Sequence, residues 1–397
     1  LLPGTIDGHL SVPGNNLVVD GITLSLAKDH TFNSIHIKNG GVLTTPIAST
    51  TFTTGIKLEA TTITVDEGSR IDVSGKGQVA DAATGFYAGG SYGGKGGNYS
   101  TYEALEPFGS YQEPIDFGRG GSGTNSRGGG VVRLVADTLQ LEGKILANGS
   151  SSSSSGGGGS GGSIWLSVGA LNSATGNGEI IANGGNRRTN YTGGGGGGGR
   201  IAIYYATKTG IADSKITVLG GVGTQQSGGV GTVYFKNTTG EVNHPFVVSG
   251  NGSTSSYATT SVSGLENETH IQINNAAVSL QGINPSVKLD LTNSQVTLTD
   301  VDTLAGELNA QGSVLNFAGN GVISNSSLGL VNTTINIAGN AQFNRAVSLQ
   351  GGAINVKGNA VFTDAFVGAS AETSSITIDG YLSVPGNNLI VDGITLS

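Results

Sequence analysis

Aliphatic and small polar residues alternate along most of the chain, which is the period-two pattern of β-strands. In the last third, short aliphatic pairs recur at nearly regular intervals, at Val296/Leu298, Leu315/Phe317, Ile335/Ile337, Ile354/Val356, Ile376/Ile378 and Ile394/Leu396. Several pairs precede Gly-Asn or Asp-Gly, which tolerate the positive φ of a tight corner. Stacked coils of a parallel β-helix repeat at about this length, ~4.8 Å apart. The pattern predicts a C-terminal solenoid over residues 241–397, with rungs of about 20 residues.

The first part of the chain shows the same alternation of aliphatic and small polar residues. Turns such as Asn39-Gly40-Gly41 separate short aliphatic pairs, which are Ile35/Ile37, Val42/Leu43, Ile56/Leu58, Ile63/Val65 and Ile71/Val73. Helical periodicity is nearly absent from the sequence. We therefore predict an all-β fold, a parallel β-helix (β-solenoid), whose N-terminal rungs occupy residues 1–73.

The middle of the chain repeats at a longer interval than the last third. Four strand-like segments align there, VVRLVAD (131–137), SIWLSVG (163–169), RIAIYYA (200–206) and TVYFKNT (232–238). Glycine-rich excursions leave the rungs at one recurring place, over residues 74–130, 149–162, 184–199 and 220–231. Insertions at one corner of stacked coils emerge on one side. We predict a Gly/Tyr-rich insertion over 74–130 and a long-rung solenoid with glycine-rich loops over 131–240.

The glycine-rich excursions admit two physical interpretations. Glycine and serine commonly form flexible linkers, because glycine loses the most entropy on ordering. Alternatively, the excursions pack on one another as extended segments, since glycine allows backbones to approach closely. The seven consecutive glycines from Gly193 to Gly199 lead directly into a strand. A run without side chains favours the second interpretation, in which neighbouring backbones press against it.

The excursion over 74–130 also holds most of the aromatic residues outside the rungs. Tyrosine combines contact area with a polar tip, which suits interfaces and sugar stacking. The rings could cover the solenoid flank, contact another copy of the chain, or bind carbohydrate. Our candidates for lateral contact are Tyr87, Tyr92, Tyr99, Tyr102, Phe108 and Tyr111.

Several glycine-rich and strand-like segments follow one another in an order that resembles known proteins. GSRIDVSGKG, GGGVVRLVAD, SGGSIWLSVG, GEIIANGG and GGGGGGGRIAIYY follow one another within residues 31–240. This order resembles glycine-rich segments of very large, repetitive, adhesin-like bacterial surface proteins. The resemblance implies a structural role at the cell surface or outside the cell, and it implies no particular activity.

One stretch of the chain occurs twice. Residues 5–25 read TIDGHLSVPGNNLVVDGITLS, and residues 377–397 differ from them only by Tyr381 for His9 and Ile390 for Val18. The duplication predicts either a window of a longer tandem polypeptide or a unit that assembles end to end. The residues predicted to make this assembly interface are Leu10, Val12, Leu17, Val19, Ile22, Leu24, Leu382, Val384, Leu389, Val391, Ile394 and Leu396.

The composition of the chain argues against two classes of binding partner. The chain has 70 glycines, 12% charged residues and a net charge of −8, and its largest basic cluster is Arg187-Arg188. Nucleic acid and anionic membrane are therefore poor partners. The absence of Cys excludes disulfides, and the absence of Met suggests a segment of a longer polypeptide. No apolar run reaches the ~18 residues of a membrane span.

The sequence predicts no catalytic, cofactor-binding or metal-binding residues. Carboxylates are sparse, and Asp300 and Asp302 form the only Asp-x-Asp pair, at an expected turn. The five histidines lack metal-ligand spacing, with His30 and His36 the nearest approach to it. Glycine-rich stretches such as Gly220–Thr224 lack the aspartate of calcium-binding nonapeptides.

These observations favour a non-enzymatic structural repeat unit of an extracellular filament, sheath or giant surface adhesin. Its expected partner is itself, end to end and laterally, with surface polysaccharide as a second candidate. An alternative is a polysaccharide lyase or glycosidase with a β-helix fold, which needs carboxylates clustered on one face. A second alternative is a glycan- or ice-binding module, for which Thr clusters such as Ala60–Thr64 are too irregular.

Overall fold

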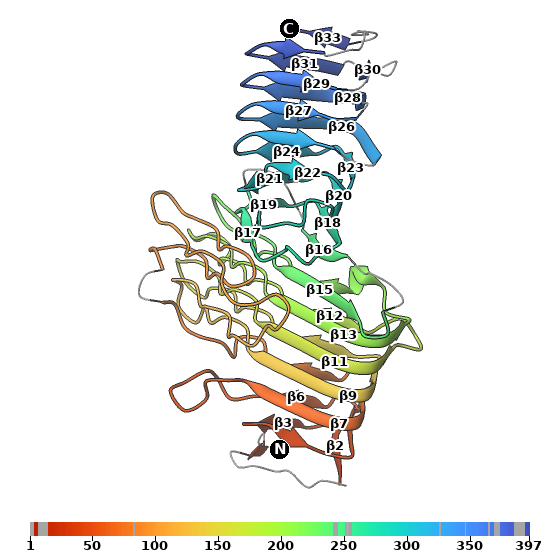
Figure 1. Cartoon of the computed structure of the whole chain (residues 1–397). Coiled ribbons are helices and arrows are strands. Elements are labelled where there is room, and N and C mark those ends of the chain that lie inside the picture. The colour runs from red at the N-terminus through yellow and green to blue at the C-terminus, as the bar shows by residue number, and fades with distance from the viewer. Residues whose placement is uncertain are drawn as a thin grey trace. The chain divides into compact units, whose positions relative to one another are not determined.

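β-Strands dominate the protein, as its computed structural model shows (Figure 1). The structure describes residues 4–6, 15–81, 84–240, 245–250, 252, 256–324, 327–345, 347–363, 366–368, 374–384 and 394–397. Over these residues the only helical element is a single 3-10 turn, η1 (Asp213–Lys215). Every pairing between named strands that is described is parallel, and the predicted all-β class is confirmed. The described helical residues include no segment that could cross a membrane.

The chain forms two compact units. Unit 1 comprises residues 1–244, 249–251 and 255–260, and unit 2 comprises residues 245–248, 252–254 and 261–397. Two short strands, β16 (Phe246–Ser249) and β17 (Thr260–Val262), contain residues of both units. The first three predicted segments, up to residue 240, all fall within unit 1.

Short strands build one parallel sheet of unit 1. Its order is β1 (Gly4–Ile6), β3 (Thr23–Leu26), β6 (Val42–Thr44), β8 (Arg70–Asp72), β10 (Lys144–Leu146), β12 (Glu179–Ile181) and β14 (Ile216–Thr217). Each strand pairs in parallel with the next along this order. Alternate side chains such as Leu43, Ile71 and Ile145 are fully buried, which accounts for their aliphatic identity.

A second set of strands, most of them longer, runs through the rest of unit 1. They are β2 (Asn16–Asp20), β4 (His30–Thr31), β5 (Ser34–Lys38), β7 (Ile56–Val65), β9 (Val131–Leu141), β11 (Ser163–Asn172), β13 (Arg200–Thr209) and β15 (Thr232–Asn237). Strands β7, β9, β11, β13 and β15 pair in parallel in sequence order. The predicted alignment of the segments starting at 131, 163, 200 and 232 is therefore confirmed in register.

Unit 2 repeats at a shorter interval. One series of parallel strands is β18 (His270–Asn274), β20 (Lys288–Thr292), β23 (Glu307–Gln311), β26 (Ser327–Ile337), β28 (Val347–Val356) and β30 (Phe366–Gly368). A second series contains β19 (Ala277–Gln281), β21 (Gln295–Thr299) and β24 (Val314–Phe317), then the later halves of β26 and β28, then β31 (Ser374–Ile378) and β33 (Ile394–Leu396). A separate sheet runs β22 (Thr303–Leu304), β25 (Gly321–Ile323), β27 (Ala341–Phe343), β29 (Ala360–Phe362) and β32 (Leu382–Ser383).

The aliphatic pairs of the C-terminal repeat lie in one register. Val296, Leu315, Ile335, Ile354 and Ile376 are consecutive partners, and each side chain is at most 3% exposed. The last step differs from the sequence alignment. Ile376 pairs with Leu396 and not with Ile394, which the alignment of aliphatic pairs places opposite it. The last repeat interval is therefore longer than the alignment predicts.

The glycine-rich excursions pack against each other beside the strands of unit 1 (Figure 1). We call residues 74–81, 84–130, 149–162, 184–199 and 220–231 the glycine block. Backbone hydrogen bonds join its segments, as in Gly90 N to Gly158 O (2.9 Å), Gly161 N to Gly197 O (2.9 Å) and Gly198 N to Gly229 O (2.9 Å). A Cβ on Gly195 would lie 1.8 Å from the carbonyl oxygen of Gly221. This close approach of backbones agrees with the packed interpretation of the excursions.

Candidate functional site

A buried arginine joins the glycine block to the strands of unit 1. Arg200, the first residue of β13, is 4% exposed. Its Nε donates to the carbonyl oxygen of Phe108 (3.0 Å), and its Nη1 donates to Thr232 Oγ1 (3.1 Å). The guanidinium also lies 5.6 Å from the centre of the Tyr92 ring. Burial lowers the pKa of Arg200 from its ordinary value, but a guanidinium remains protonated at any physiological pH.

Tyr92 forms the second part of this anchor. Its side chain is fully buried, and its hydroxyl lies 2.6 Å from Ser163 Oγ. Ser163 Oγ donates to the carbonyl oxygen of Asp116 (2.6 Å), so the Tyr92 hydroxyl is the donor to Ser163. Burial raises the pKa of Tyr92 to about 12. The phenol is therefore a neutral structural group and not a catalytic acid or base near pH 7.

Three of the six aromatic residues predicted to make lateral contacts pack inside their own chain. Tyr92 and Tyr111 are buried, and Tyr111 contacts the Tyr234 ring at 5.5 Å between centroids. Phe108 lies 5.0 Å from the Tyr92 ring and 4.0 Å from the guanidinium carbon of Arg119. We no longer assign these three residues to lateral contact, because neighbouring rings and cations of the same chain already occupy their faces.

The other three predicted residues form an exposed aromatic cluster with Phe86. Tyr87 contacts Phe86, Tyr99 and Tyr102 at centroid separations of 5.9, 5.5 and 6.0 Å. Phe86 is 72% exposed and Tyr102 is 42% exposed, whereas Tyr87 and Tyr99 are half-buried. We call Phe86, Tyr87, Tyr99 and Tyr102 the aromatic cluster.

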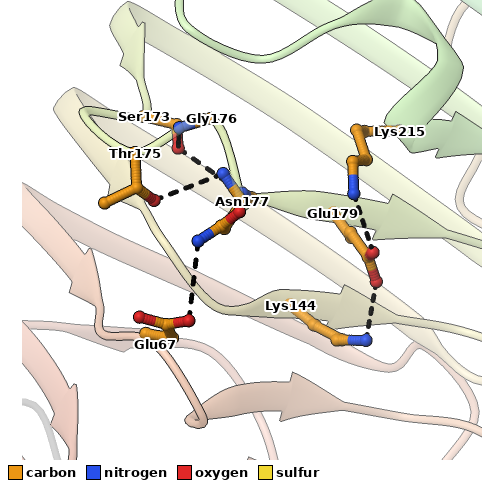
Figure 2. Close-up of polar contacts among 9 residues, drawn as sticks. Glu67, Lys144, Ser173, Thr175, Gly176, Asn177, Glu179 and Lys215 are labelled. Carbon is orange, nitrogen blue, oxygen red and sulfur yellow. Dashed lines mark hydrogen bonds and ion pairs between the residues drawn. The ribbon is translucent and has the colours of Figure 1, made fainter.

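A polar cleft of about 420 Å³ lies where the short strands β8, β10 and β12 begin. Figure 2 shows its central contacts, in which Glu179 accepts from Lys144 (2.7 Å) and Lys215 (3.4 Å). These three residues occupy neighbouring strands or the turn before β14, which brings their side chains into one row. Glu67 accepts a long hydrogen bond from Asn177 (3.5 Å) across the same cleft.

Glu142 in this cleft holds a turn in place. Its carboxylate accepts hydrogen bonds from Ser173 Oγ (2.9 Å), from the backbone N–H groups of Ala174 (2.6 Å) and Thr175 (3.0 Å), and from the Thr175 hydroxyl. Desolvation alone would raise the pKa of Glu142, but these donors outweigh it and lower the pKa to about 2. The carboxylate is therefore ionised at neutral pH and cannot serve as a general acid there.

The cleft offers paired charges and not a reactive constellation. Glu179 pairs with both Lys144 and Lys215. The carboxylate oxygens of Glu142 are occupied by hydrogen-bond donors of the turn after β11. Within the described residues, no group of three or more His, Asp or Glu side chains is placed to hold a metal ion. His30 and His36 illustrate this, because His30 contacts the Ala27 carbonyl oxygen at 3.1 Å while His36 pairs with Asp66 at 2.9 Å.

Unit 2 contains a charged network that the sequence interpretation missed. His270 Nε2 lies 2.6 Å from Asp290 Oδ2, and Asn309 Nδ2 donates to both Asp290 Oδ1 and Glu307 Oε1 at 2.8 Å. Lys288 lies 3.7 Å from Asp290 and 3.5 Å from Glu307. These residues occupy alternate positions of β18, β20 and β23, so the regular spacing of these strands was the available signal. Each carboxylate is held by a cation and an amide, which is the arrangement of a structural ion-pair network.

A ladder of amides follows another series of strands in unit 2. Asn336 Nδ2 donates to Asn316 Oδ1 (2.8 Å), and Asn355 Nδ2 donates to Asn336 Oδ1 (2.8 Å). The three residues are direct partners in the parallel register of β24, β26 and β28. A second ladder joins Asn320, Asn340 and Asn359 at the following turn. Asn320 Oδ1 accepts the backbone N–H of Asn340, and Asn340 Oδ1 accepts the backbone N–H of Asn359. Identical side chains thus bond along the stacking direction.

The duplicated stretch is described in part. Leu10, Val12, Leu389 and Val391 lie outside the described residues, and only the backbone of Ile394 and Leu396 is described. Val19 and Leu24 are buried, Leu17, Leu382 and Val384 are half-buried, and Ile22 is 42% exposed.

Both copies use the same pairing offset. In the first copy Thr5 pairs with Ser25. In the second copy the backbone of Ser397 bonds Ile376 and Ile378, on either side of Thr377, and the hydroxyls of Thr377 and Ser397 lie 3.2 Å apart. The sequence interval between the partners is the same in both pairs. Equivalent residues therefore find equivalent partners within each unit.

Comparisons with protein-family models, curated proteins and solved structures find no match to this chain. Functional inference therefore rests on the geometry of the chain itself.

Proposed function

We propose that the chain is a parallel β-solenoid and a structural repeat unit of an extracellular filament, sheath or giant surface adhesin. In this proposal each coil stacks on the next through parallel backbone pairing, and successive units continue the stack end to end. The observation that carries the proposal is the pairing offset that the two duplicated stretches share, Thr5 with Ser25 and Thr377 with Ser397. A stretch that recurs with the same local pairing is suited to meet its counterpart in the next unit.

The repeating side-chain ladders support a structural role. The amide ladder through Asn316, Asn336 and Asn355 bonds only along the stacking direction, so it can be extended by any further coil of the same kind. Its residues are half-buried by their own neighbours and serve as lateral supports of the stack. The buried Arg200 and Tyr92 similarly hold the glycine block in place and offer no reactive group.

An extracellular location is part of the proposal and is compatible with the composition. A chain without cysteine has no thiol that an oxidising environment could modify. Regular β-stacking also resists local opening, because each coil is paired on both sides.

Electron microscopy of the full chain tests end-to-end assembly, and β33 supplies a directed variant. Ser397 uses its backbone N–H and carbonyl to bond Ile376 and Ile378 (3.0 Å each), so strand alternation aims the Leu396 N–H at the opposite edge. Leu396→Pro removes that donor and should leave the pairing with β31 intact. We expect linear assemblies from the unmodified chain and from Leu396→Val, and shorter or no assemblies from Leu396→Pro.

Compact particles of uniform mass from the unmodified chain would contradict the proposal. Equal assembly by Leu396→Pro and Leu396→Val would show that this edge is not the contact. Circular dichroism of both variants checks that the fold is retained.

A further inference from the structure

The aromatic cluster is held rigidly although two of its rings, Phe86 and Tyr102, are exposed. Tyr99 and Tyr102 exchange two backbone hydrogen bonds of 3.0 Å, which close a tight turn. The Tyr87 carbonyl accepts from Gly194 N (2.7 Å), which ties the cluster to the run of seven glycines. The segment belongs to the orange loops of unit 1 in Figure 1. A rigid support lowers the entropy that a ligand must overcome when it binds.

Tyr87 adopts a strained backbone conformation in this cluster. Its φ is 65°, in the left-handed region that costs a non-glycine residue roughly 1–2 kcal/mol. The conformation places its ring in contact with Phe86, Tyr99 and Tyr102 at once. Strain of this kind commonly accompanies a functional arrangement, because folding alone would favour a relaxed residue.

The cluster is edged by polar groups that have spare hydrogen-bonding capacity. The hydroxyls of Tyr87, Tyr99 and Tyr102 have no hydrogen-bond partner among the described residues. Gln225 is exposed, and its Oε1 accepts from Ser100 N (2.6 Å) within the Tyr99–Tyr102 turn. This contact fixes the Gln225 amide at the turn that carries Tyr99 and Tyr102, and its Nε2 has no hydrogen-bond partner among the described residues. Rings and amide donors therefore occur together.

This combination matches the chemistry of a neutral sugar chain. The C–H face of a pyranose is weakly positive and packs on the negative face of an aromatic ring, while its hydroxyls need donors and acceptors at the edge. Glu103, directly after Tyr102 in the chain, is exposed, whereas the nearest cation along the chain, Lys95, is paired with Glu106. The Glu103 carboxylate would repel an acidic polysaccharide.

We propose that the aromatic cluster and Gln225 form a binding site for neutral polysaccharide. The site suits a glycan better than a second protein, because a stable protein interface takes roughly 20–30 residues a side whereas the cluster has four rings. A few exposed rings on a rigid support suffice for a sugar chain, and many repeated units would add avidity. This inference is independent of end-to-end assembly.

Affinity gel electrophoresis of the full chain tests the site. The gels contain hydroxyethylcellulose, dextran or galactomannan as neutral probes, and alginate as an acidic probe. We expect retardation in at least one neutral gel and none in alginate. Phe86→Ala combined with Tyr102→Ala should weaken the retained interaction by at least roughly tenfold, since truncating aromatic anchors commonly costs more than 1 kcal/mol.

Tyr381→Ala is the matched control, because Tyr381 is an 84% exposed tyrosine outside the cluster. It should migrate as the unmodified chain does. Gln225→Ala should weaken binding without changing thermal unfolding, which separates a contact role from a folding role. No retardation in any neutral gel, or equal retardation of the double variant, would overturn the proposal. A double variant that loses self-association but keeps glycan binding would assign the cluster to a protein contact instead.

Discussion

At the scale of single residues, a few buried polar side chains determine how the glycine block meets the strands. Arg200 satisfies a backbone carbonyl in the excursion and a hydroxyl on β15, while Tyr92 reaches Ser163 on β11. Polar groups this deeply buried are costly unless they are paired. Their pairing selects one docking position for an excursion that has little apolar surface of its own.

Arg200→Ala should destabilise unit 1 by about 2–4 kcal/mol, because it leaves the Phe108 carbonyl and the Thr232 hydroxyl without their donor. Urea unfolding followed by the fluorescence of Trp165, the single tryptophan, reports on unit 1 directly. Arg188→Ala is the matched control, since Arg188 is exposed and stacks on Tyr191 at 4.8 Å. If Arg200→Ala changes the free energy of unfolding no more than this control does, the anchor is dispensable.

Glu142 gives a prediction for the acid range. Its pKa falls from the ordinary 4.5 to about 2 on folding, so its ionised form stabilises the folded chain above pH 4.5. That contribution is lost progressively as the pH falls from about 4.5 to about 2, where the folded carboxylate is protonated. As the pH falls through this window, the thermal unfolding temperature of the unmodified chain should therefore decrease more steeply than that of Glu142→Gln. Parallel pH profiles of the two proteins would contradict the assigned role.

At the scale of elements, the strands and the glycine block follow different packing rules. Strands bury alternate aliphatic side chains, such as Ile63 and Val65 in β7. The glycine block has few side chains to bury and uses backbone hydrogen bonds between extended segments. Its order therefore depends on backbone spacing, and a single methyl group is enough to disturb it.

Gly195→Ala tests this dependence. The added Cβ would lie 1.8 Å from Gly221 O, closer than any real contact, so the surrounding segments must shift. We expect a loss of roughly 1–3 kcal/mol or more in unfolding free energy, again followed by Trp165 fluorescence. Gly319→Ala is the control, because its nearest atom would be Asp302 Oδ1 at 3.9 Å. Since Gly319 lies in unit 2, circular dichroism is used to compare the unfolding of the two variants. If both variants unfold alike, the glycine block is not tightly packed.

Much of the strand pattern could be predicted from sequence, because period-two alternation reports directly which side chains are buried. The stacking of Leu315, Ile335 and Ile354 followed from their spacing alone. The pairing of Ile376 with Leu396 did not, since a shift from Ile394 to Leu396 preserves the alternation.

Contacts between distant segments were harder to predict. Covering of the solenoid flank was one alternative for the aromatic residues, but the sequence did not single out Tyr92 and Tyr111, because composition cannot tell a ring under a loop from a ring on its surface. The contact between His270 and Asp290 needs the register of β18 and β20 before it appears. Both cases depend on which segments lie side by side, and the alternation within one strand does not carry that information.

At the scale of the whole molecule, each unit is built from parallel pairing that repeats along one direction. Unit 1 repeats at intervals set by its glycine-rich excursions, and unit 2 repeats at a shorter interval, as in Leu315 with Ile335. The duplicated stretch uses one pairing offset in both copies. On the proposed account, the same pairing continues from unit to unit, so that a filament is one uninterrupted stack of coils.

Fibre X-ray diffraction from aligned assemblies of the full chain tests this claim most directly. Continuous stacking of parallel coils along the filament predicts a meridional reflection at about 4.8 Å, parallel to the fibre axis. Leu396→Pro should lose this alignment, and Leu396→Val should keep it. A reflection at about 4.8 Å on the equator would place the strands along the filament. That result, or fibres with no reflection at this spacing, would contradict the account.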